Sequence, residues 1–419
     1  MGRVLAIILA GGGGQRLYPL TMMRSKPSVP FGGKYRIIDF TLSNCVNTGI
    51  RRIYILTQYR SGSLNQHVFE GWNISGSRLG EFVYNVPAQQ KTGTDWYRGT
   101  ADALRQNLDL IEEKNVEYVL ILSGDHIYKM NYQQLVDYHV KKKADLSVCA
   151  VRVPKEQAAG ALGVLEIDAN SRLLGFEEKP LNPKTIPGSP EYALGSMGVY
   201  IFTVGVLQKA LQEPGDDFGK NIIPQMIQGN RAVFVYDFEK WNKIEDFIVQ
   251  YKDGKRFSVL AKRTRDSSYW RDVGTIDSYY EANMDLIGVD PSFNLYGIKW
   301  PLRTYERNSP PSKFVLGGNA TESIVSKGCI ISAGTVIRSV LSPNVIVERG
   351  SVIEDTVIFE DVVIEPHAHI KKAIIDKHVH IESGASLGFD KEKDKQQGCT
   401  ISETGIVVVP KQHVIKALK

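Results

Sequence analysis

A run of glycines near the start of the chain is the first candidate for a chemical site. Gly11–Gly14 directly follow the apolar segment Val4–Ala10, and Arg16 and Lys26 come shortly after. Glycines let a backbone approach phosphates closely, and successive N–H groups can converge on an anion. The spacing is neither a dinucleotide fingerprint, which needs a third glycine where Arg16 stands, nor a P-loop, which ends in Gly-Lys-Ser/Thr. A tight turn is the alternative, but the two cations favour a site that grips a polyphosphate from both sides.

Two aspartates are candidates for holding a divalent cation. Asp125 follows the apolar run Tyr118–Leu122, and Asp272 stands in a second polar motif, Trp270–Thr275. An acidic residue at the carboxyl end of a parallel strand lies where open α/β sheets bind ligands, and carboxylates can hold Mg²⁺ on phosphate oxygens. Because Gly-Asp is also common in plain turns, Asp125 alone does not establish a metal site.

Two further polar segments could belong to the same site. In Glu177–Pro180, Lys179 stands beside acidic residues, an arrangement equally typical of a surface turn. Trp96–Thr100 precedes a helical pattern, whose N-terminal amides could serve a phosphate or a sugar.

The histidines and cysteines indicate no second catalytic centre. Alternate strand positions face the same side, so a metal site is conceivable where two His-x-His pairs occur, but exposed histidines are the simpler interpretation. These are His367, His369, His378 and His380. The four cysteines form no Cys-x-x-Cys pair, which argues against a zinc or redox motif and favours free thiols in a reducing compartment.

Apolar runs alternate with helical patterns over the first 290 or so residues, which predicts an α/β sheet covered on both faces. The expected strands are 4–10, 53–57, 118–122, 146–151 and 233–236, and the expected helices are 62–71, 101–113, 132–142 and, after Thr275, 276–286.

A different period governs the end of the chain. After a stretch rich in proline and glycine, 290–318, which is interpreted as a linker, aliphatic residues recur every six positions. A helix would spread such positions around its surface, whereas a parallel β-helix needs one inward aliphatic residue per flat side. The residues expected to point inward are Ile324, Ile330, Val336, Val340, Ile346, Val352, Ile358, Ile364, Ile370, Ile375, Ile381 and Leu387. A β-helix domain over 319–419 and a first domain over 1–289 are therefore predicted.

Charge and composition exclude several classes of partner. The net charge of +5 comes without a basic arm or stripe, so no nucleic-acid partner is expected, while small anionic molecules suit this balance. The apolar run at 4–10 is far too short to span a membrane and does not read as a signal peptide, so the protein is expected to be cytoplasmic.

Taken together, the motifs resemble ADP-glucose pyrophosphorylase, the bacterial-type glucose-1-phosphate adenylyltransferase family, over nearly the whole chain. The segments that carry the resemblance are Leu9–Gly12, Arg24–Pro27, Phe31–Phe40, Trp96–Asp102, Gly124–Lys129, Glu178–Pro180 and Trp270–Thr275. Sugar nucleotidyltransferases in general share the glycine loop and the Glu-Lys-Pro. The Gly-Asp-His-Ile-Tyr-Lys and Trp-Arg-Asp-Val-Gly-Thr motifs are far more particular to this family, to which the C-terminal hexapeptide β-helix also belongs.

The resemblance implies a Rossmann-like nucleotidyltransferase domain with a mostly parallel mixed sheet, followed by a left-handed parallel β-helix. It also implies transfer of the adenylyl group of ATP to glucose 1-phosphate with Mg²⁺, regulation by small-molecule effectors, and a homotetramer. The implied nucleotide-binding and catalytic residues are Leu9, Ala10, Gly11, Gly12, Arg16, Lys26, Gln89, Gly124 and Asp125, with Asp125 and Asp272 as metal ligands. The implied glucose-1-phosphate residues are Tyr97, Gly163, Glu178, Lys179 and Ser196, and Gln58 and Trp96 match positions that link regulation to the substrates.

Two positions depart from the family pattern. Met23 stands where enteric-type members carry a lysine that serves sugar-phosphate activation, and Gly13 stands where they carry an arginine. We therefore expect a weak or altered response to fructose 1,6-bisphosphate. A non-catalytic regulatory subunit and a pyrophosphorylase for another nucleotide are the alternatives. Asp125, Lys179 and Asp272 argue against the first, because such subunits typically lose a metal carboxylate or the sugar-phosphate lysine.

Overall fold

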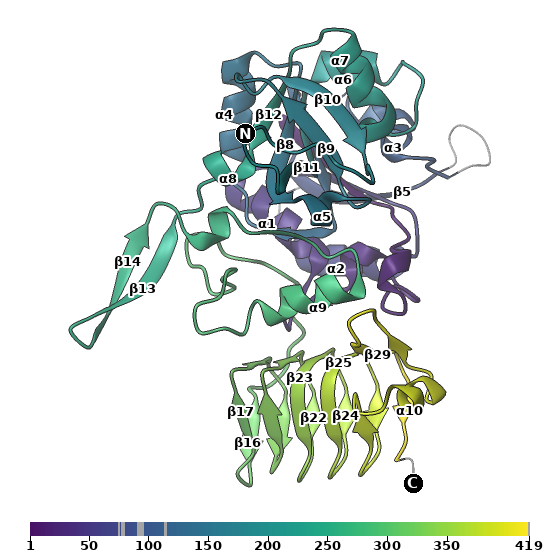
Figure 1. The fold of residues 1–419 in the computed structure, drawn as a ribbon, viewed down its shortest axis with the longest axis vertical. Coiled ribbons are helices and arrows are strands. Elements are labelled where there is room, and N and C mark those ends of the chain that lie inside the picture. The colour runs from purple at the N-terminus through teal and green to yellow at the C-terminus, as the bar shows by residue number, and fades with distance from the viewer. Residues whose placement is uncertain (74–75, 77–79, 90–95, 113–114, 418–419) are drawn as a thin grey trace.

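The computed structural model describes residues 1–73, 76, 80–89, 96–112 and 115–417. It consists of a three-layer α/β domain that stands on a C-terminal β-helix (Figure 1). The strands of the main sheet are β1 Val4–Ala10, β4 Arg52–Thr57, β5 Phe82–Pro87, β6 Tyr118–Ser123, β8 Leu146–Pro154, β9 Gly163–Ile167, β10 Leu173–Glu178, β11 Tyr192–Thr203 and β12 Val233–Asp237.

The sheet is mixed and mainly parallel, as predicted. Strands β5, β4, β1 and β6 pair parallel in that order. Strand β11 then runs antiparallel to both β6 and β8, and β12 continues parallel to β8. The short β9 and β10 extend the sheet from the other half of β11.

Helices cover both faces of this sheet. They are α1 Ile37–Thr48, α2 Gly62–Trp72, α3 Thr100–Arg105, α4 Tyr132–Lys142, α5 Lys155–Ala158, α6 Val204–Ala210, α7 Ile223–Gln228, α8 Phe238–Trp241 and α9 Ile276–Met284. Ala6 and Ile8 of β1 pack with α1, α2 and α4, whereas Leu5 and Ile7 pack with α3, α6 and α7. A strand buried on both faces is uniformly apolar rather than alternating, which is why β1 was recognisable from its sequence.

The loops that follow the central strands gather at one edge. The carboxyl ends of β1, β4, β5 and β6 lead into Gly11, Gln58, Ala88 and Gly124, respectively. Beside them, β7 His126–Tyr128 pairs antiparallel with β15 Trp270–Asp272. Parallel order thus brings the predicted site segments to one edge of the sheet, as expected for an open α/β fold.

The C-terminal part is a stack of coils with three parallel ladders of short strands. The ladders contain β16 Lys313–Val315, β17 Asn319–Thr321, β18 Ile324–Val325, β19 Ile330–Ser332, β20 Thr335–Ile337, β21 Val340–Leu341, β22 Ile346–Val347, β23 Val352–Ile358, β24 Val363–Ile364, β25 His369–Ile375, β26 His380–Ile381, β27 Ser386–Leu387, β29 Val407–Val409 and β30 Val414–Ile415. The parallel pairing agrees with the predicted β-helix. Its first strand, β16, falls inside the range interpreted as a linker.

The phase of the six-residue repeat was partly wrong. Ile330 is 36% exposed, and Ile324, Ile346 and Val352 are only partly buried. The residues that fill the coil interior are Ile331, Val336, Leu341, Val347, Ile353, Ile358, Ile364, Ile370, Ile375, Ile381 and Leu387. Successive coils are 16 or 17 positions apart, as in Ile330–Ile346 and Ile346–Val363, so each coil includes at least one step of five among its steps of six.

A row of outward-facing residues joins the β-helix to the α/β domain. Val340, Val357, Ile374 and Val408 alternate with the inward residues of one ladder and pack against the α/β domain, including Tyr279 of α9. Val340, expected to point inward, therefore belongs to this shared core.

A buried ion pair crosses the same junction. Arg24 donates two hydrogen bonds to the Asp376 carboxylate, at 3.0 and 2.9 Å, and both side chains are at most 4% exposed.

The segment 290–305 lies on the α/β domain rather than in solvent. Its contacts with α1 include donation from Trp300 Nε1 to Asn44 Oδ1 (3.0 Å) and from Thr304 to Asp39 (2.7 Å). Gly71 of α2 passes so close that a Cβ there would lie 2.7 Å from Tyr305 Cβ. This part of the chain therefore helps to fix α1 and α2.

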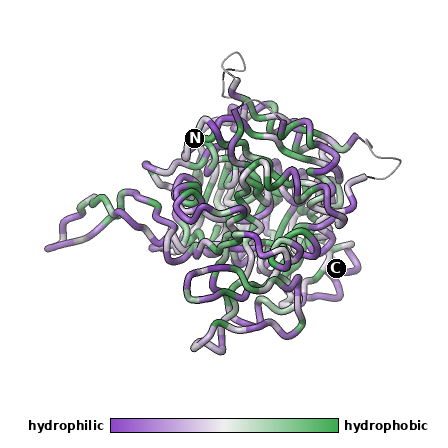
Figure 2. Tube along the Cα trace, turned by 90° about the horizontal axis from the view of Figure 1, so that it is seen from above, coloured by the Kyte–Doolittle hydropathy of each residue, from purple (hydrophilic) through white to green (hydrophobic). Residues whose placement is uncertain are grey.

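Two excursions leave the compact body. The hairpin β13 Asp246–Lys252 and β14 Lys255–Ala261 projects away from the sheet in both views (Figures 1 and 2), while most hydrophobic residues lie inside the body (Figure 2). The second excursion, between Leu387 and Val407, holds α10 Lys391–Gln396 and β28 Thr400–Ile401. It contacts the start of α9, because Ser402 donates a 2.7 Å hydrogen bond to Asp277.

The Arg24–Asp376 pair gives a test of the junction. Removing one partner leaves an uncompensated buried charge, so we expect Arg24→Met or Asp376→Asn to lower the free energy of unfolding by about 3–5 kcal/mol in urea titrations. The Arg24→Met/Asp376→Leu double variant should recover part of that loss. Arg338→Met, which removes a partly exposed ion pair with Asp355, serves as the control and should change stability little. Single variants as stable as the control would contradict this role.

Candidate active site

A cleft of about 800 Å³ opens at the carboxyl edge of the central strands. Its lining contains many of the residues predicted from the sequence, namely Leu9, Ala10, Gly11, Gly12, Arg16, Lys26, Gln58, Tyr97, Asp125, Glu178 and Lys179. The fold therefore brings together residues that are up to 170 positions apart in the chain.

Lys26 connects the two predicted metal ligands. Its ammonium group donates to Asp125 Oδ2 at 2.8 Å and to Asp272 Oδ1 at 2.9 Å. Asp125 follows β6 and Asp272 ends β15, so two separate strands deliver carboxylates to one point. A cation thus already lies between these carboxylates, which shows that the space between them accepts positive charge.

The electrostatics around the cleft keep Asp125 and Lys26 charged. Burial by itself would raise the pKa of the Asp125 carboxyl, but Lys26 and His126 hold it well below its usual range. Burial also opposes the charge on Lys26, and Asp125 and Asp272 outweigh it, so the pKa of Lys26 is raised above 10.5. The Lys26–Asp125 pair therefore stays ionised across the neutral range.

Glycine is required at two places around this pair. Gly14 has a φ of +60°, and a Cβ there would lie 3.1 Å from Lys26 Cβ. At Gly274, a Cβ would lie 3.0 Å from both Asp272 oxygens and 3.1 Å from Arg16 Nη2. The exposed Arg16 thus ends near Gly274, in the neighbourhood of Asp272.

The other end of the cleft surrounds Glu178. Burial raises the pKa of its carboxyl, and the nearby Asp217 adds to the effect. Two glycines make room for it, because Cβ atoms at Gly219 and Gly163 would lie 2.5 and 3.0 Å from Glu178 Oε2. Lys179 Nζ is 4.0 Å from Glu178 and its side chain is half exposed, so it is free to reach a ligand in the cleft.

Several predicted residues act through their neighbours or lie apart. Ser196 is buried, with its hydroxyl 3.4 Å from that of Tyr200, which lines the cleft. Gly124 is buried beneath the glycine loop and donates to Leu9 O at 3.1 Å. Gln89 is exposed just beyond β5 and is not among the lining residues.

Gln58 and Trp96 prove to be neighbours. The Tyr97 N–H donates to Gln58 Oε1 at 2.8 Å, and Trp96 precedes it with a side chain that is largely exposed. Tyr97 is held from its other end, because Asn107 donates to its hydroxyl at 2.9 Å. Gln58 therefore fixes the segment that carries both Trp96 and Tyr97.

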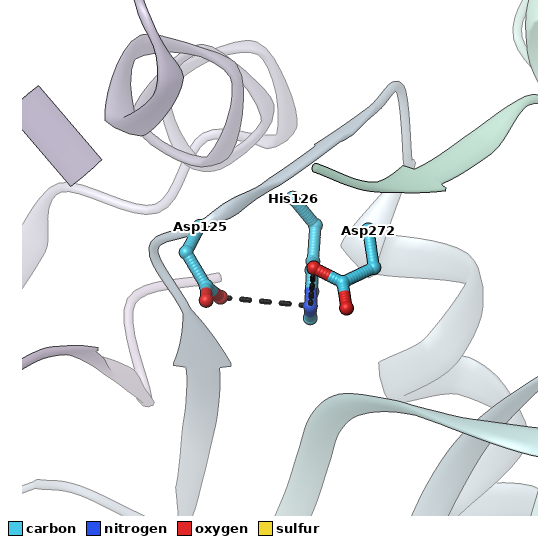
Figure 3. Close-up of side chains that lie close together, drawn as sticks. All are labelled: Asp125, His126 and Asp272. Atoms are coloured by element: carbon cyan, nitrogen blue, oxygen red, sulfur yellow. Dashed lines mark ion pairs between the residues drawn. The ribbon is translucent and has the colours of Figure 1, made fainter. Parts of the chain in front are cut away.

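Sequence reasoning missed three residues of the cleft. Asp217 and Tyr200 line it, but they lie in segments without a recognisable pattern. His126 was quoted only as part of a motif, yet it forms with Asp125 and Asp272 a group whose ligand atoms all lie within 4.8 Å of one another (Figure 3). The position of His126 directly after Asp125 was the sequence signal that could have identified it.

The four β-helix histidines do not converge. His380 pairs with Glu365 at 2.8 Å, and His378 lies 3.6 Å from Asp361. Across the described ranges, the Asp125–His126–Asp272 group is the only cluster of metal-type ligands found.

A second cavity, of about 580 Å³, lies between the α/β domain and the β-helix. Its charged lining has more cations than acids: Lys34, Arg36, Arg307, Lys327 and Lys377 against Glu70, Glu306 and Glu360. Burial lowers the pKa of Arg36, which lies close to Arg24 and Arg307.

Comparisons with known proteins agree with this geometry. The nucleotidyl transferase family matches residues 5–288, and the GlmU-like C-terminal hexapeptide family matches 310–409. A glucose-1-phosphate adenylyltransferase from Anaeromyxobacter sp. is 45% identical over 98% of each chain. The chain belongs to the glucose-1-phosphate adenylyltransferase family of nucleotidyl transferases. Family members from Deinococcus radiodurans and Shewanella oneidensis are 44% and 46% identical, over 98% and 96% of this chain and 99% and 94% of theirs.

In the part of the chain that the structure describes, no helix combines the length and the apolar character needed to cross a membrane.

The charge state of Lys26 can be measured directly. Because Asp125 raises the pKa of Lys26, we expect Asp125→Asn to lower that pKa and speed acetylation of Lys26 by acetic anhydride at pH 9. A fall of one unit gives about tenfold more free amine. Labelling is read by peptide mass spectrometry, with Asp217→Asn, a carboxylate elsewhere in the cleft, as the matched control. Equal labelling rates in both variants would contradict the pairing.

Proposed function

We propose that the chain transfers the adenylyl group of ATP to α-D-glucose 1-phosphate, giving ADP-glucose, the activated donor for glycogen synthesis, and pyrophosphate. The observation that carries the proposal is the Asp125–Asp272 pair, which the Lys26 ammonium group bridges beside a cleft lined by the glycine loop. The relatives from Anaeromyxobacter sp. and Deinococcus radiodurans are glucose-1-phosphate adenylyltransferases, a name that describes adenylyl transfer to glucose 1-phosphate.

The triphosphate is assigned to the glycine-loop end of the cleft. Backbone N–H groups of Gly11 and Gly12 can approach phosphate oxygens closely, while Arg16 and Lys26 supply charge from the opposite side. Gln89 is assigned to the adenine end, beyond β5.

Glucose 1-phosphate is assigned to the end around Glu178. The half-exposed Lys179 can pair with its phosphate, and the partly buried Glu178 can accept hydrogen bonds from sugar hydroxyls. Gly163 and Gly219 leave the space that this carboxylate occupies. Tyr97 lines the same cleft, and Ser196 is assigned to it through its contact with Tyr200. The two substrate ends meet at Asp125.

Mg²⁺ is the proposed cofactor. Asp125 and Asp272 are oxygen ligands of the kind that this ion prefers, and the Lys26 ammonium group shows that a cation is accommodated between them. When bound, the ion would neutralise the developing charge on the transferred phosphate. Arg16 and Lys26 share that task, and the loop that carries Lys26 orients the triphosphate for in-line attack. The sugar phosphate is already a nucleophile at neutral pH, so no general base is needed.

The proposed reaction is tested with Asp125→Asn. Removing a key electrostatic stabiliser should lower kcat by at least about 100-fold while circular dichroism shows a retained fold. The assay follows pyrophosphate from ATP and glucose 1-phosphate, and a panel of UTP, GTP and CTP tests the choice of nucleotide. Asp137→Asn on the exposed face of α4 is the control. Turnover by Asp125→Asn near that of the control would overturn the metal assignment, and an inactive wild-type chain would favour a regulatory subunit.

Small-molecule effectors are proposed to bind in the interdomain cavity. Five cations against three acids in its lining favour an anionic ligand. The buried Arg24–Asp376 pair also lies at the domain junction, two residues from Lys26.

The proposed response to fructose 1,6-bisphosphate is weak. Met23 is half exposed and carries no charge where enteric-type members have a lysine, so one phosphate contact is missing. Activation is measured as the ratio of kcat/KM with and without about 1 mM fructose 1,6-bisphosphate, and this ratio should stay below about twofold. Met23→Lys should raise the ratio roughly tenfold, because one charge-assisted contact contributes about 1.4 kcal/mol. Strong activation of the unmodified chain would refute this.

The remaining proposals concern the setting of the enzyme. From the resemblance we propose that the protein is a homotetramer in the cytoplasm. We also propose that its chain divides into a first domain over 1–289, a linker over 290–318 and a β-helix domain over 319–419. Four buried free cysteines suit a reducing compartment. The projecting β13–β14 hairpin supports an assembly, because five of its apolar side chains are exposed and an isolated hairpin is only marginally stable in water.

A further inference from the structure

His126 is a buried imidazole without a hydrogen bond, in the middle of the proposed reaction centre. The residue is 9% exposed, and its Nδ1 has no hydrogen-bond partner. Its Nε2 lies 3.5 Å from Asp125 Oδ1 and 3.9 Å from Asp272 Oδ1, which is too far for ordinary hydrogen bonds. Buried polar groups are normally satisfied, so this imidazole calls for a partner that the chain itself does not supply.

The backbone aims the ring at the carboxylates. His126 follows Asp125 and lies directly opposite Asp272 in the β7–β15 ladder, so both strands fix its direction. Trp270 packs against the far side of the ring, with centroids 5.0 Å apart. Figure 3 shows the ring between the two carboxylates, and dashed lines run from its Nε2 to an oxygen of each.

The separations fit the ligands of one octahedral ion. Ligands about 2.1 Å from an ion stand roughly 3.0 Å apart when adjacent and 4.2 Å apart when opposite. The two distances from Nε2, 3.5 and 3.9 Å, lie between these values, and all three ligand atoms lie within 4.8 Å of one another, so a small inward movement would bring them around one ion. A packing role for the imidazole would explain the contact with Trp270 but not why Nε2 is held beside two carboxylates at distances too long for hydrogen bonds.

We propose that His126 is a third protein ligand of the active-site cation and that it shifts the preference of the site from Mg²⁺ toward Mn²⁺. This deepens, and rests on, the function proposed above. Mg²⁺ takes oxygen ligands almost exclusively, whereas transition ions gain more from an imidazole nitrogen. The mixed site therefore binds Mn²⁺ more tightly, relative to Mg²⁺, than two carboxylates would.

Pulsed electron paramagnetic resonance of bound Mn²⁺ tests the ligand without measuring turnover. The full chain, labelled with ¹⁵N-histidine, is loaded with Mn²⁺ and a non-hydrolysable ATP analogue, because the phosphates give Lys26 an alternative partner. We expect a ¹⁵N coupling to Mn²⁺, which nucleotide nitrogens cannot produce. The coupling should vanish in His126→Gln and persist in His378→Gln, whose histidine lies on the β-helix.

Competition between the two ions gives a second readout. Loss of a residue that only supports a metal ligand lowers metal affinity by roughly tenfold, and loss of the ligand itself should lower it at least as much. The ratio of Mn²⁺ affinity to Mg²⁺ affinity should therefore fall about tenfold in His126→Gln. Bound Mn²⁺ without a ¹⁵N coupling in the wild-type chain would overturn the inference and leave the proposed function standing. Failure to bind Mn²⁺ with the analogue, together with absent ADP-glucose synthesis, would instead overturn the proposed function. If His126→Gln does not fold, the presence or absence of the ¹⁵N coupling in the wild-type chain alone tests whether a histidine binds the ion.

Discussion

The two ion pairs of Lys26 set the geometry on which the rest of the catalytic domain depends. Asp125 and Asp272 would repel each other at this separation without a cation between them. Holding them there requires β6, the β7–β15 ladder and the loop before α1 to meet at one point. Arg24, two residues earlier in that loop, faces the other way and pairs with Asp376 of the β-helix. One short segment therefore ties the reaction centre to the domain below it.

Features carried by single strands or contiguous motifs could be predicted from the sequence. Strand β1 begins and ends where its apolar run does, and α4 coincides with its predicted helix. The glycine loop and Asp125 were found because each follows a recognisable strand, and Lys26 was found because it is a second cation shortly after the glycine loop. The lining of the cleft brings these residues to one place, while their individual roles stay predictions.

Features that arise from pairing between distant segments could not be predicted in this way. Strand β11 occupies the middle of the sheet, but Tyr192–Thr203 contains glycines and polar residues among its apolar ones. It pairs with β8 along both halves, while its other edge pairs first with β9 and then with β6. The inward phase of the β-helix was misjudged after Val340, because this residue is apolar for another reason, namely contact with α9 and its neighbours. Steps of six counted from it reached Ile346 and Val352, which are only partly buried. His126 escaped notice because its partners come from a strand almost 150 positions away.

The excursion between Leu387 and Val407 shows how this architecture tolerates changes in length. Ile370 and Ala373 are three positions apart, whereas their ladder partners Leu387 and Val407 are twenty apart. The added chain leaves at a corner and returns in register, since Val414 still pairs with His380. A corner of the β-helix thus accepts an insertion as long as a whole coil without disturbing the stack. Relatives can therefore diverge in loops at such corners, and acquire new contacts with α9, while the site above keeps its geometry.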